Sequence, residues 1–145
     1  MEIELMEVYS SEQISKKMFE MVNKWYKDTS CLYPLSIYEV FNKVKVIPYN
    51  LESGLFQALS RPKFTLNGKA PFIACANKAI VLASYAKLLS IPFGFVLCKN
   101  DLSQDYYHVN NVFRLSGQKI YLDATYPEFY INKKVVFVDT LEVWR

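Results

Sequence analysis

The stretch ANKAIVLASYAKLLSIPFGFVLC, residues 76–98, carries the clearest structural pattern in the chain. Residues 76–89 are rich in good helix formers and almost uncharged, so they predict a helix that is apolar on most sides. Such a helix belongs in the centre of a hydrophobic core. Pro92 ends the helical pattern, and the apolar run 93–98 predicts a buried strand.

The apolar stretch 79–98 also has the length of a membrane span. It contains Lys87 at its centre, followed by Ser90, Pro92 and Gly94. Because a charge inside a span is costly in hydrocarbon, the sequence favours a buried helix, a turn and a buried strand over a membrane segment.

The residues on either side of this stretch predict an α+β fold, with helices packed on one face of an antiparallel sheet. The expected helices are a first one that begins at a cap on Ser10 or Ser11 and ends near 28–30, a shorter one starting at Ser36 with Glu39 in a capping box, and 50–60. Residues 43–48 are expected to be extended, and the expected strands are 107–115, 119–123, 135–139 and 141–144. We interpret 1–145 as one domain, with a helical N-terminal region at 1–43, a core at 44–128 and C-terminal strands at 129–145.

Composition narrows the classes of protein and of site. A chain of 145 residues with 52% hydrophobic and 21% charged residues is typical of one globular domain, which excludes intrinsic disorder. The net charge of +3 gives no support to a nucleic-acid partner. Cys31, Cys75, Cys98 and one histidine cannot form a four-ligand zinc site without carboxylates, so no metal or other cofactor is expected. Three glutamates within the first seven residues argue against a signal peptide, and the cysteine pattern indicates a reducing compartment.

Cys75 is the first candidate for chemistry, because it comes immediately before the predicted central helix. The unpaired N–H groups and the positive end of the helix dipole favour a thiolate at such a position. The same N–H groups can stabilise a developing oxyanion. The position of Cys75 is also compatible with a buried cysteine that does not react, because such cysteines are common in apolar surroundings.

His108 and Asp123 are the two other groups that a thiol mechanism needs. His108 is the only histidine, and an imidazole is the usual base beside a nucleophilic thiol. If the flanking strands are joined by a two-residue turn at Ser116-Gly117, Asn110 faces Asp123, and His108 becomes a diagonal neighbour of Asp123 on one sheet face. The carboxylate could then orient the ring, as in a catalytic triad. A bulge or a longer loop would change this register and leave a structural histidine and a turn aspartate.

Four segments that include these residues follow one another in a characteristic order: Cys75-Ala76-Asn77-Lys78-Ala79, Ser90-Ile91-Pro92, His108-Val109-Asn110-Asn111-Val112-Phe113 and Tyr121-Leu122-Asp123-Ala124-Thr125. This order resembles the transglutaminase-like superfamily, a branch of the papain-like cysteine enzymes. Its members have a block like G-D-C-D-D-x-A, a G-I-P turn, a strand that begins with histidine and a strand that ends in L-D-x-T. Residues 61–68, RPKFTLNG, are similar to the P-x-x-T-L-x-x-G lead-in of small phage and prokaryotic members. The resemblance covers residues 44–128.

The resemblance implies a papain/transglutaminase-like fold, in which a central helix with Cys75 at its N-terminus packs on an antiparallel sheet carrying His108 and Asp123. It also implies that these three residues are catalytic. Cys75 would attack an amide or peptide carbonyl, His108 would transfer the proton, and Asp123 would hold His108. Water as acceptor of the thioester would make a peptidase or amidase, and a lysine amine would make a cross-linking transglutaminase.

Three further residues are expected to bind the substrate. Tyr106 and Tyr107, beside His108, are predicted to form a cleft wall, and Asn67, Trp25 and a tyrosine are the candidates for the second donor to the oxyanion. The expected partners are a peptide or protein amide, such as a peptidoglycan peptide, or other virion proteins, in a host or prokaryotic cytoplasm or in a virion.

The alternative is a non-catalytic virion structural, assembly or binding protein that retains this fold. Ile73-Ala74 stand where the family has Gly-Asp, and Ala76-Asn77 stand in place of the two acids after the cysteine. The high aromatic content, 16%, would also suit an interface. An accessible Cys75 within hydrogen-bond range of His108 would favour the enzyme, and a separated pair would favour the alternative.

Overall fold

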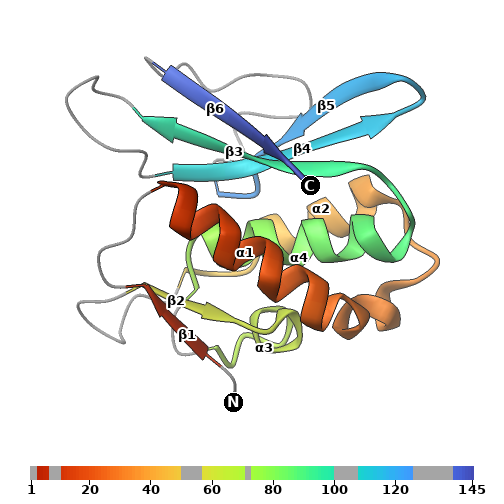
Figure 1. Cartoon of the computed structure of the whole chain (residues 1–145). Coiled ribbons are helices and arrows are strands. Elements are labelled where there is room, and N and C mark those ends of the chain that lie inside the picture. Colours follow the sequence, from red (N-terminus) through yellow and green to blue (C-terminus); the bar gives the residue numbers. More distant parts are fainter. Residues whose placement is uncertain (1–2, 7–10, 50–56, 71–72, 100–107, 126–138) are drawn as a thin grey trace.

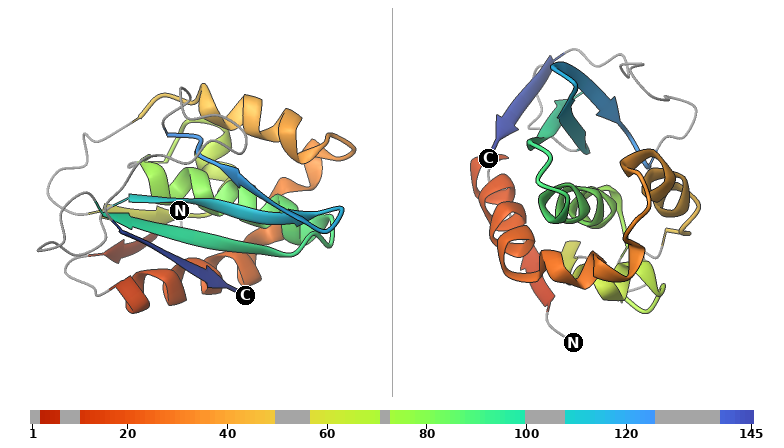
Figure 2. Two further views of the ribbon diagram at one scale, coloured as in Figure 1. Left: turned by 90° about the horizontal axis from the view of Figure 1, so that it is seen from above. Right: turned by 90° about the vertical axis from the view of Figure 1, so that its right-hand side faces the viewer.

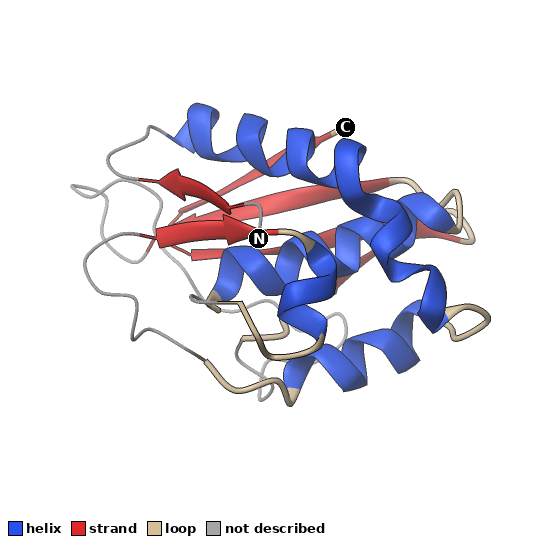
Figure 3. Ribbon diagram, turned by 90° about the horizontal axis from the view of Figure 1, so that it is seen from below, coloured by secondary structure: helices blue, strands red, loops and turns tan. Residues whose placement is uncertain are grey.

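A computed structural model describes residues 3–6, 11–49, 57–70, 73–99, 108–125 and 139–145. Figure 1 shows the four-stranded sheet at the top, the helices below it, and the short two-stranded ladder of β1 and β2 below the helices. The elements in chain order are β1 (Ile3–Met6), α1 (Ser11–Trp25), the 3-10 helix η1 (Tyr26–Leu32), α2 (Ile37–Lys45), β2 (Gln57–Ser60), α3 (Pro62–Leu66), α4 (Cys75–Leu88), β3 (Phe93–Lys99), β4 (His108–Leu115), β5 (Gln118–Leu122) and β6 (Asp139–Trp144). The main sheet is antiparallel with the order β5-β4-β3-β6, and Figure 3 shows the helices covering it from below. The α+β fold is thereby confirmed.

The helix α4 lies at the centre of the molecule, with every residue from 76 to 86 buried. It packs against α1, α2, α3 and η1 and, on its other side, against β3 and β4. The right-hand view of Figure 2 shows it surrounded by α1, α2 and the sheet. The buried Tyr85 hydroxyl donates a hydrogen bond to the Leu35 carbonyl and also lies 3.3 Å from the Leu32 carbonyl, which connects the helix to the end of η1 and the residues after it. The predicted central helix is therefore confirmed, and Ser90, in the left-handed region (φ 59°), turns the chain after it.

The hairpin of β4 and β5 has the predicted register. Its two turn residues, Ser116 and Gly117, have φ angles of 50° and 77°, as the tight hairpin turn requires. Leu115 pairs with Gln118, and Asn111 pairs with Leu122. The next residues beyond that pair are Asn110 and Asp123, so these two face each other as expected.

Some local expectations are wrong. Residues 57–60 form β2, not the end of a helix over 50–60, because they pair with β1, which lies more than fifty residues earlier. The remaining residues of that predicted helix, 50–56, lie outside the described ranges. Residues 1–43, which are expected to be a helical region, also contain the strand β1. The first helix ends at Trp25 and not near 28–30, because the chain continues there as the 3-10 helix η1.

The segment expected to be extended, 43–48, starts as helix, because α2 continues to Lys45 to bury Val44. The Ser36–Glu39 capping box that begins α2 is confirmed. Of the two expected C-terminal strands, 141–144 forms most of β6, whereas 135–138 lie outside the described residues.

The main sheet curls, so that its two edge strands approach each other on the face away from α4. Tyr121 on β5 donates a hydrogen bond to Glu142 on β6 at 2.7 Å, and Lys119 forms an ion pair with the same carboxylate at 3.0 Å. The Trp144 indole N–H also donates to Glu142, at 3.2 Å. A small apolar cluster of Val96, Cys98 and Val112, with Tyr121 and Trp144 packed against it, fills this concave face. Figure 2 shows β5 and β6 converging.

Gly94 on β3 allows β6 to approach this closely. A Cβ atom there would lie 2.7 Å from the Val143 carbonyl oxygen and 3.2 Å from the Trp144 Cα atom. We expect Gly94→Ala to lower the free energy of unfolding by about 1–3 kcal/mol, because backbone on a paired strand must move. Urea denaturation followed by circular dichroism measures this change.

Gly117→Ala is the control, because a Cβ atom at Gly117 would have nothing within 4 Å and only the left-handed φ of 77° would be strained. That strain costs about 1 kcal/mol. A Gly94→Ala loss no larger than the loss for Gly117→Ala would contradict the close packing of β3 and β6.

Candidate active site

Cys75 is the first residue of α4 and is half-buried. Ala74 precedes it in an extended conformation (φ −140°, ψ −168°) and has no side chain that could cap the helix. The first backbone N–H groups of a helix have no acceptor within the helix. The sulfur of Cys75 is therefore attached to a helix terminus that favours negative charge.

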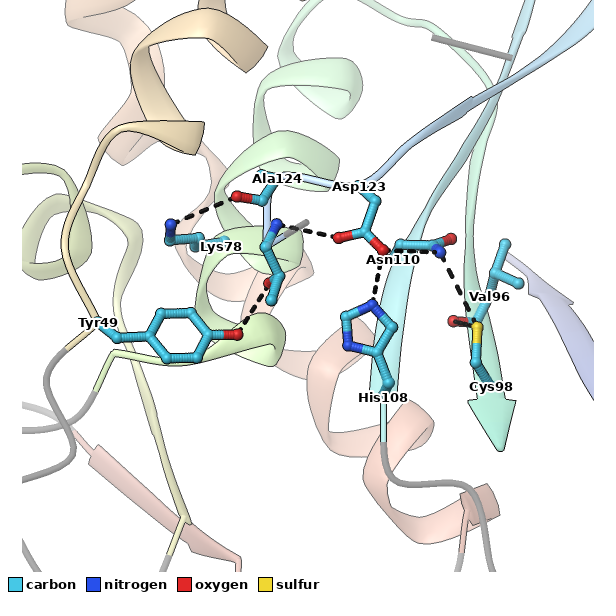
Figure 4. A network of polar contacts seen from close by, with 9 residues as sticks. Tyr49, Lys78, Val96, Cys98, His108, Asn110, Asp123 and Ala124 are labelled. Atoms are coloured by element: carbon cyan, nitrogen blue, oxygen red, sulfur yellow. Dashed lines mark hydrogen bonds and ion pairs between the residues drawn. The ribbon is translucent and has the colours of Figure 1, made fainter. Parts of the chain in front are cut away.

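Asp123, immediately after β5, is buried and accepts three hydrogen bonds. His108 Nε2 lies 2.7 Å from one carboxylate oxygen, and the Asn110 amide nitrogen lies 3.3 Å from the same oxygen. The backbone N–H of Thr125 donates to the other oxygen at 3.0 Å. These contacts, drawn in Figure 4, fix the orientation of the carboxylate and, through it, the orientation of the imidazole.

The His108 imidazole, which is 3% exposed, also interacts with the Cys75 thiol, and this interaction contributes to the pKa of the ring. Because Nε2 contacts Asp123, Nδ1 is the ring nitrogen left for the sulfur. Burial of the ring lowers the pKa of His108, but hydrogen bonds and attraction to Asp123 and Cys75 outweigh it and raise the pKa to about 9. The ring between these two acidic groups is thus suited to carry a positive charge at neutral pH.

The structure thus brings together the three residues predicted to be catalytic, and their roles stay a prediction. Asn67 is exposed at the end of α3, where its side-chain oxygen accepts a hydrogen bond from the Lys69 N–H at 2.9 Å, and its role as an oxyanion donor stays a prediction. Tyr106 and Tyr107, the predicted cleft wall, lie outside the described residues.

The sequence interpretation missed three residues around this site. Asn110 contacts Asp123, and its position opposite Asp123 in the hairpin register was a usable signal. Lys78 is buried one helical turn beyond Cys75, and its charge within an otherwise apolar helix was a second signal. The Tyr49 hydroxyl donates to Thr125 Oγ1 at 3.0 Å, which places an exposed phenol ring beside the end of β5; no local pattern indicated that long-range contact.

Within the described ranges, no group of three or more histidine, cysteine, aspartate or glutamate side chains could hold a metal ion. Among the same residues, no helix is both long enough and apolar enough to cross a membrane. Comparisons with protein-family models, with curated proteins and with solved structures find no match to this chain.

The raised pKa of His108 predicts a pH-dependent stability. A group whose pKa is raised from 6.5 to about 9 by folding binds its proton more tightly in the folded state. Its contribution is therefore complete below about pH 6.5 and is lost as the pH rises through about 9. We expect the free energy of unfolding to fall by up to about 3 kcal/mol over this interval, as measured by urea denaturation at a series of pH values.

His108→Gln is the control for this dependence, because it keeps a polar side chain that does not titrate. Other groups titrate in both proteins, so the difference between the two curves isolates His108, the only histidine. Parallel curves for the native protein and His108→Gln between pH 6.5 and about 9 would contradict the raised pKa.

Proposed function

We propose that the protein is a cysteine enzyme of transglutaminase-like type, which cleaves an amide or peptide bond, or transfers its acyl group, through a thioester on Cys75. One observation carries this proposal: the His108 imidazole is hydrogen-bonded to the buried carboxylate of Asp123 at 2.7 Å, and its pKa is raised both by that carboxylate and by the Cys75 thiol at the start of α4. Nucleophilic thiol catalysis requires a base beside the thiol and a third group that orients the base.

In the acylation step, the Cys75 proton passes to His108 and the sulfur forms a bond with the substrate carbonyl carbon. The electron pair of the C=O bond moves to oxygen, and the backbone N–H of Cys75 donates a hydrogen bond to that oxyanion. The oxyanion then reforms its carbonyl as the C–N bond breaks, and the His108 imidazolium gives its proton to the leaving nitrogen. An amine leaves, and the acyl group remains on the sulfur.

In the deacylation step, His108 takes a proton from water or from a primary amine as that molecule adds to the thioester carbon. The sulfur leaves and regains the proton. Water yields a carboxylic acid, and an amine yields a new amide. Asp123 keeps its hydrogen bond to Nε2 in both steps and compensates the imidazolium charge.

Alkylation by iodoacetamide tests the thiol–imidazole pair, because each of the three cysteines has a different environment. Cys31 is exposed, Cys75 is half-buried and Cys98 is buried. Accessibility alone would make Cys31 the fastest to react. We expect Cys75 to react faster than Cys31 at about pH 6, and His108→Ala to slow Cys75 by about tenfold or more while Cys31 is unchanged. Mass spectrometry of the tryptic peptides locates the label.

A different result would favour another class of function. If Cys75 reacts more slowly than Cys31 at every pH and is indifferent to His108→Ala, the enzyme proposal fails. The fold would then serve binding or assembly, as in a virion structural component, and the search would turn to protein partners.

The acyl acceptor is tested with a glutamine-containing peptide and a fluorescent primary amine. We expect hydrolysis, with release of ammonia and without incorporation of the amine, because small single-domain proteins of this type resemble hydrolases. Cys75→Ala is the matched blank, since it removes the nucleophile. Incorporation of the amine at a rate above that of hydrolysis would instead assign acyl transfer.

A further inference from the structure

Lys78 is a buried cation close to the candidate active site. It lies one helical turn beyond Cys75 on α4, and only 3% of its surface is exposed. Buried lysines are rare, because removing an ammonium group from water is costly unless other groups compensate its charge. The groups that surround its Nζ atom therefore indicate what the charge does.

Three separate segments contact the Lys78 ammonium group. Nζ donates hydrogen bonds to the Lys45 carbonyl at the end of α2, at 3.3 Å, and to the Ala124 carbonyl after β5, at 3.4 Å. The Tyr49 ring centroid lies 5.3 Å from Nζ. Figure 4 shows Lys78 bonded to the same short segment that carries Asp123.

Asp123 is the acidic group that attracts this ammonium. Burial lowers the pKa of Lys78, and attraction to the Asp123 carboxylate raises it in part. Asp123 thus lies between two cationic groups, Lys78 on one side and the His108 imidazolium on the other. Its negative charge is shared between them.

We propose that Lys78 is a positioning residue, which holds the segment of Asp123 against α4 and offsets the charge of Asp123, so that His108 can release its proton. This role rests on the function proposed above. An unopposed carboxylate would bind the imidazolium proton more tightly, and a proton held too tightly is transferred poorly to a leaving amine. Lys78 weakens that hold without touching the substrate.

The groups that face His108 and Lys78 come from several elements. His108 is faced by Cys75 from α4, by Asp123 after β5, by Asn110 on its own strand and by Cys98, its cross-strand partner on β3. Lys78 is faced by Asp123 and by the Tyr49 phenol. Asp123 interacts with both Lys78 and His108. Removing the charge of Lys78 should therefore change the pKa of His108 through the Asp123 carboxylate.

The test is an NMR titration of the imidazole resonances, which come from one residue because the chain has one histidine. Lys78→Gln keeps a hydrogen-bond donor and removes the charge. In this variant we expect the ratio of protonated to neutral imidazole at about pH 9 to rise about threefold or more. Lys78→Arg keeps the charge, so its His108 titration should resemble that of the native protein.

Lys87→Gln is the matched control, because it removes a lysine charge from the last turn of the same helix, where the ammonium lies 5.1 Å from the Tyr26 ring centroid. Its His108 titration should equal that of the native protein. If Lys78→Gln also leaves the ratio unchanged, or if Lys78→Arg raises it as Lys78→Gln does, the role of the charge is overturned. Circular dichroism verifies that each variant is folded; a Lys78→Gln chain that does not fold while Lys78→Arg folds and keeps the native titration supports the role of the charge.

The titration needs no substrate, so it separates this proposal from the proposed function. A kinetic measurement then joins the two: Lys78→Gln should lower kcat for amide hydrolysis by about threefold or more with KM unchanged, because proton transfer is affected and binding is not. An inactive native protein with the expected titration would refute the enzyme alone. An active native protein whose His108 titration ignores Lys78→Gln would refute the role of Lys78 alone.

Discussion

A helix without a polar face, such as α4, is stable only when other elements cover it on every side. That requirement accounts for the layout of this small fold. The helices α1 and α2 with η1 cover one side of α4, and β3 and β4 cover the other. The helix is partly accessible only at its two ends: Cys75 at its first position is half-buried, as are Lys87 and Leu88 at its last two, whereas residues 76–86 are buried. The N-terminal end of this buried helix, which carries the Cys75 thiol, lies at the end of the sheet where β4 begins with His108.

Much of this arrangement could be predicted from local patterns. The apolar run of α4, the capping box of α2 and the two-residue turn at Ser116 each specify a local structure, and the turn also sets the register that places His108 near Asp123. The pairing of β1 with β2 could not be predicted in this way, because strand partners distant in sequence leave no local periodicity, and the four-residue spacing of leucines before and within β2 imitated a helix. Lys78 was missed for a similar reason: its partners, the carbonyls of Lys45 and Ala124, meet only through tertiary packing.

The candidate site is a row of alternating charges in a largely buried environment. Lys78, Asp123, His108 and the Cys75 thiol follow one another, and each touches or attracts the next. If the thiol ionises while the imidazole is protonated, the row has two positive and two negative groups and no net charge. A low-dielectric interior tolerates such a neutral set far better than it tolerates an isolated ion. The residues beside Cys75, Ile73-Ala74 and Ala76-Asn77, carry no charge, so the charged members of this row come from elsewhere on α4 and from β4 and the end of β5.

The contacts that close the curled sheet rest on one carboxylate. Glu142 accepts hydrogen bonds from Lys119 and Tyr121 on one edge strand and from Trp144 on the other. Removing the acceptor would take away the Glu142 bond of both the Tyr121 hydroxyl and the Trp144 N–H, which are half-buried. Removing the Tyr121 or Lys119 donor would weaken the link between β5 and β6. Over evolutionary time these four positions are therefore not free to drift independently. A substitution at one of them is tolerated most easily after a compensating substitution at another. These positions at the edges of the sheet should therefore vary less, and more often together, than other positions near the surface.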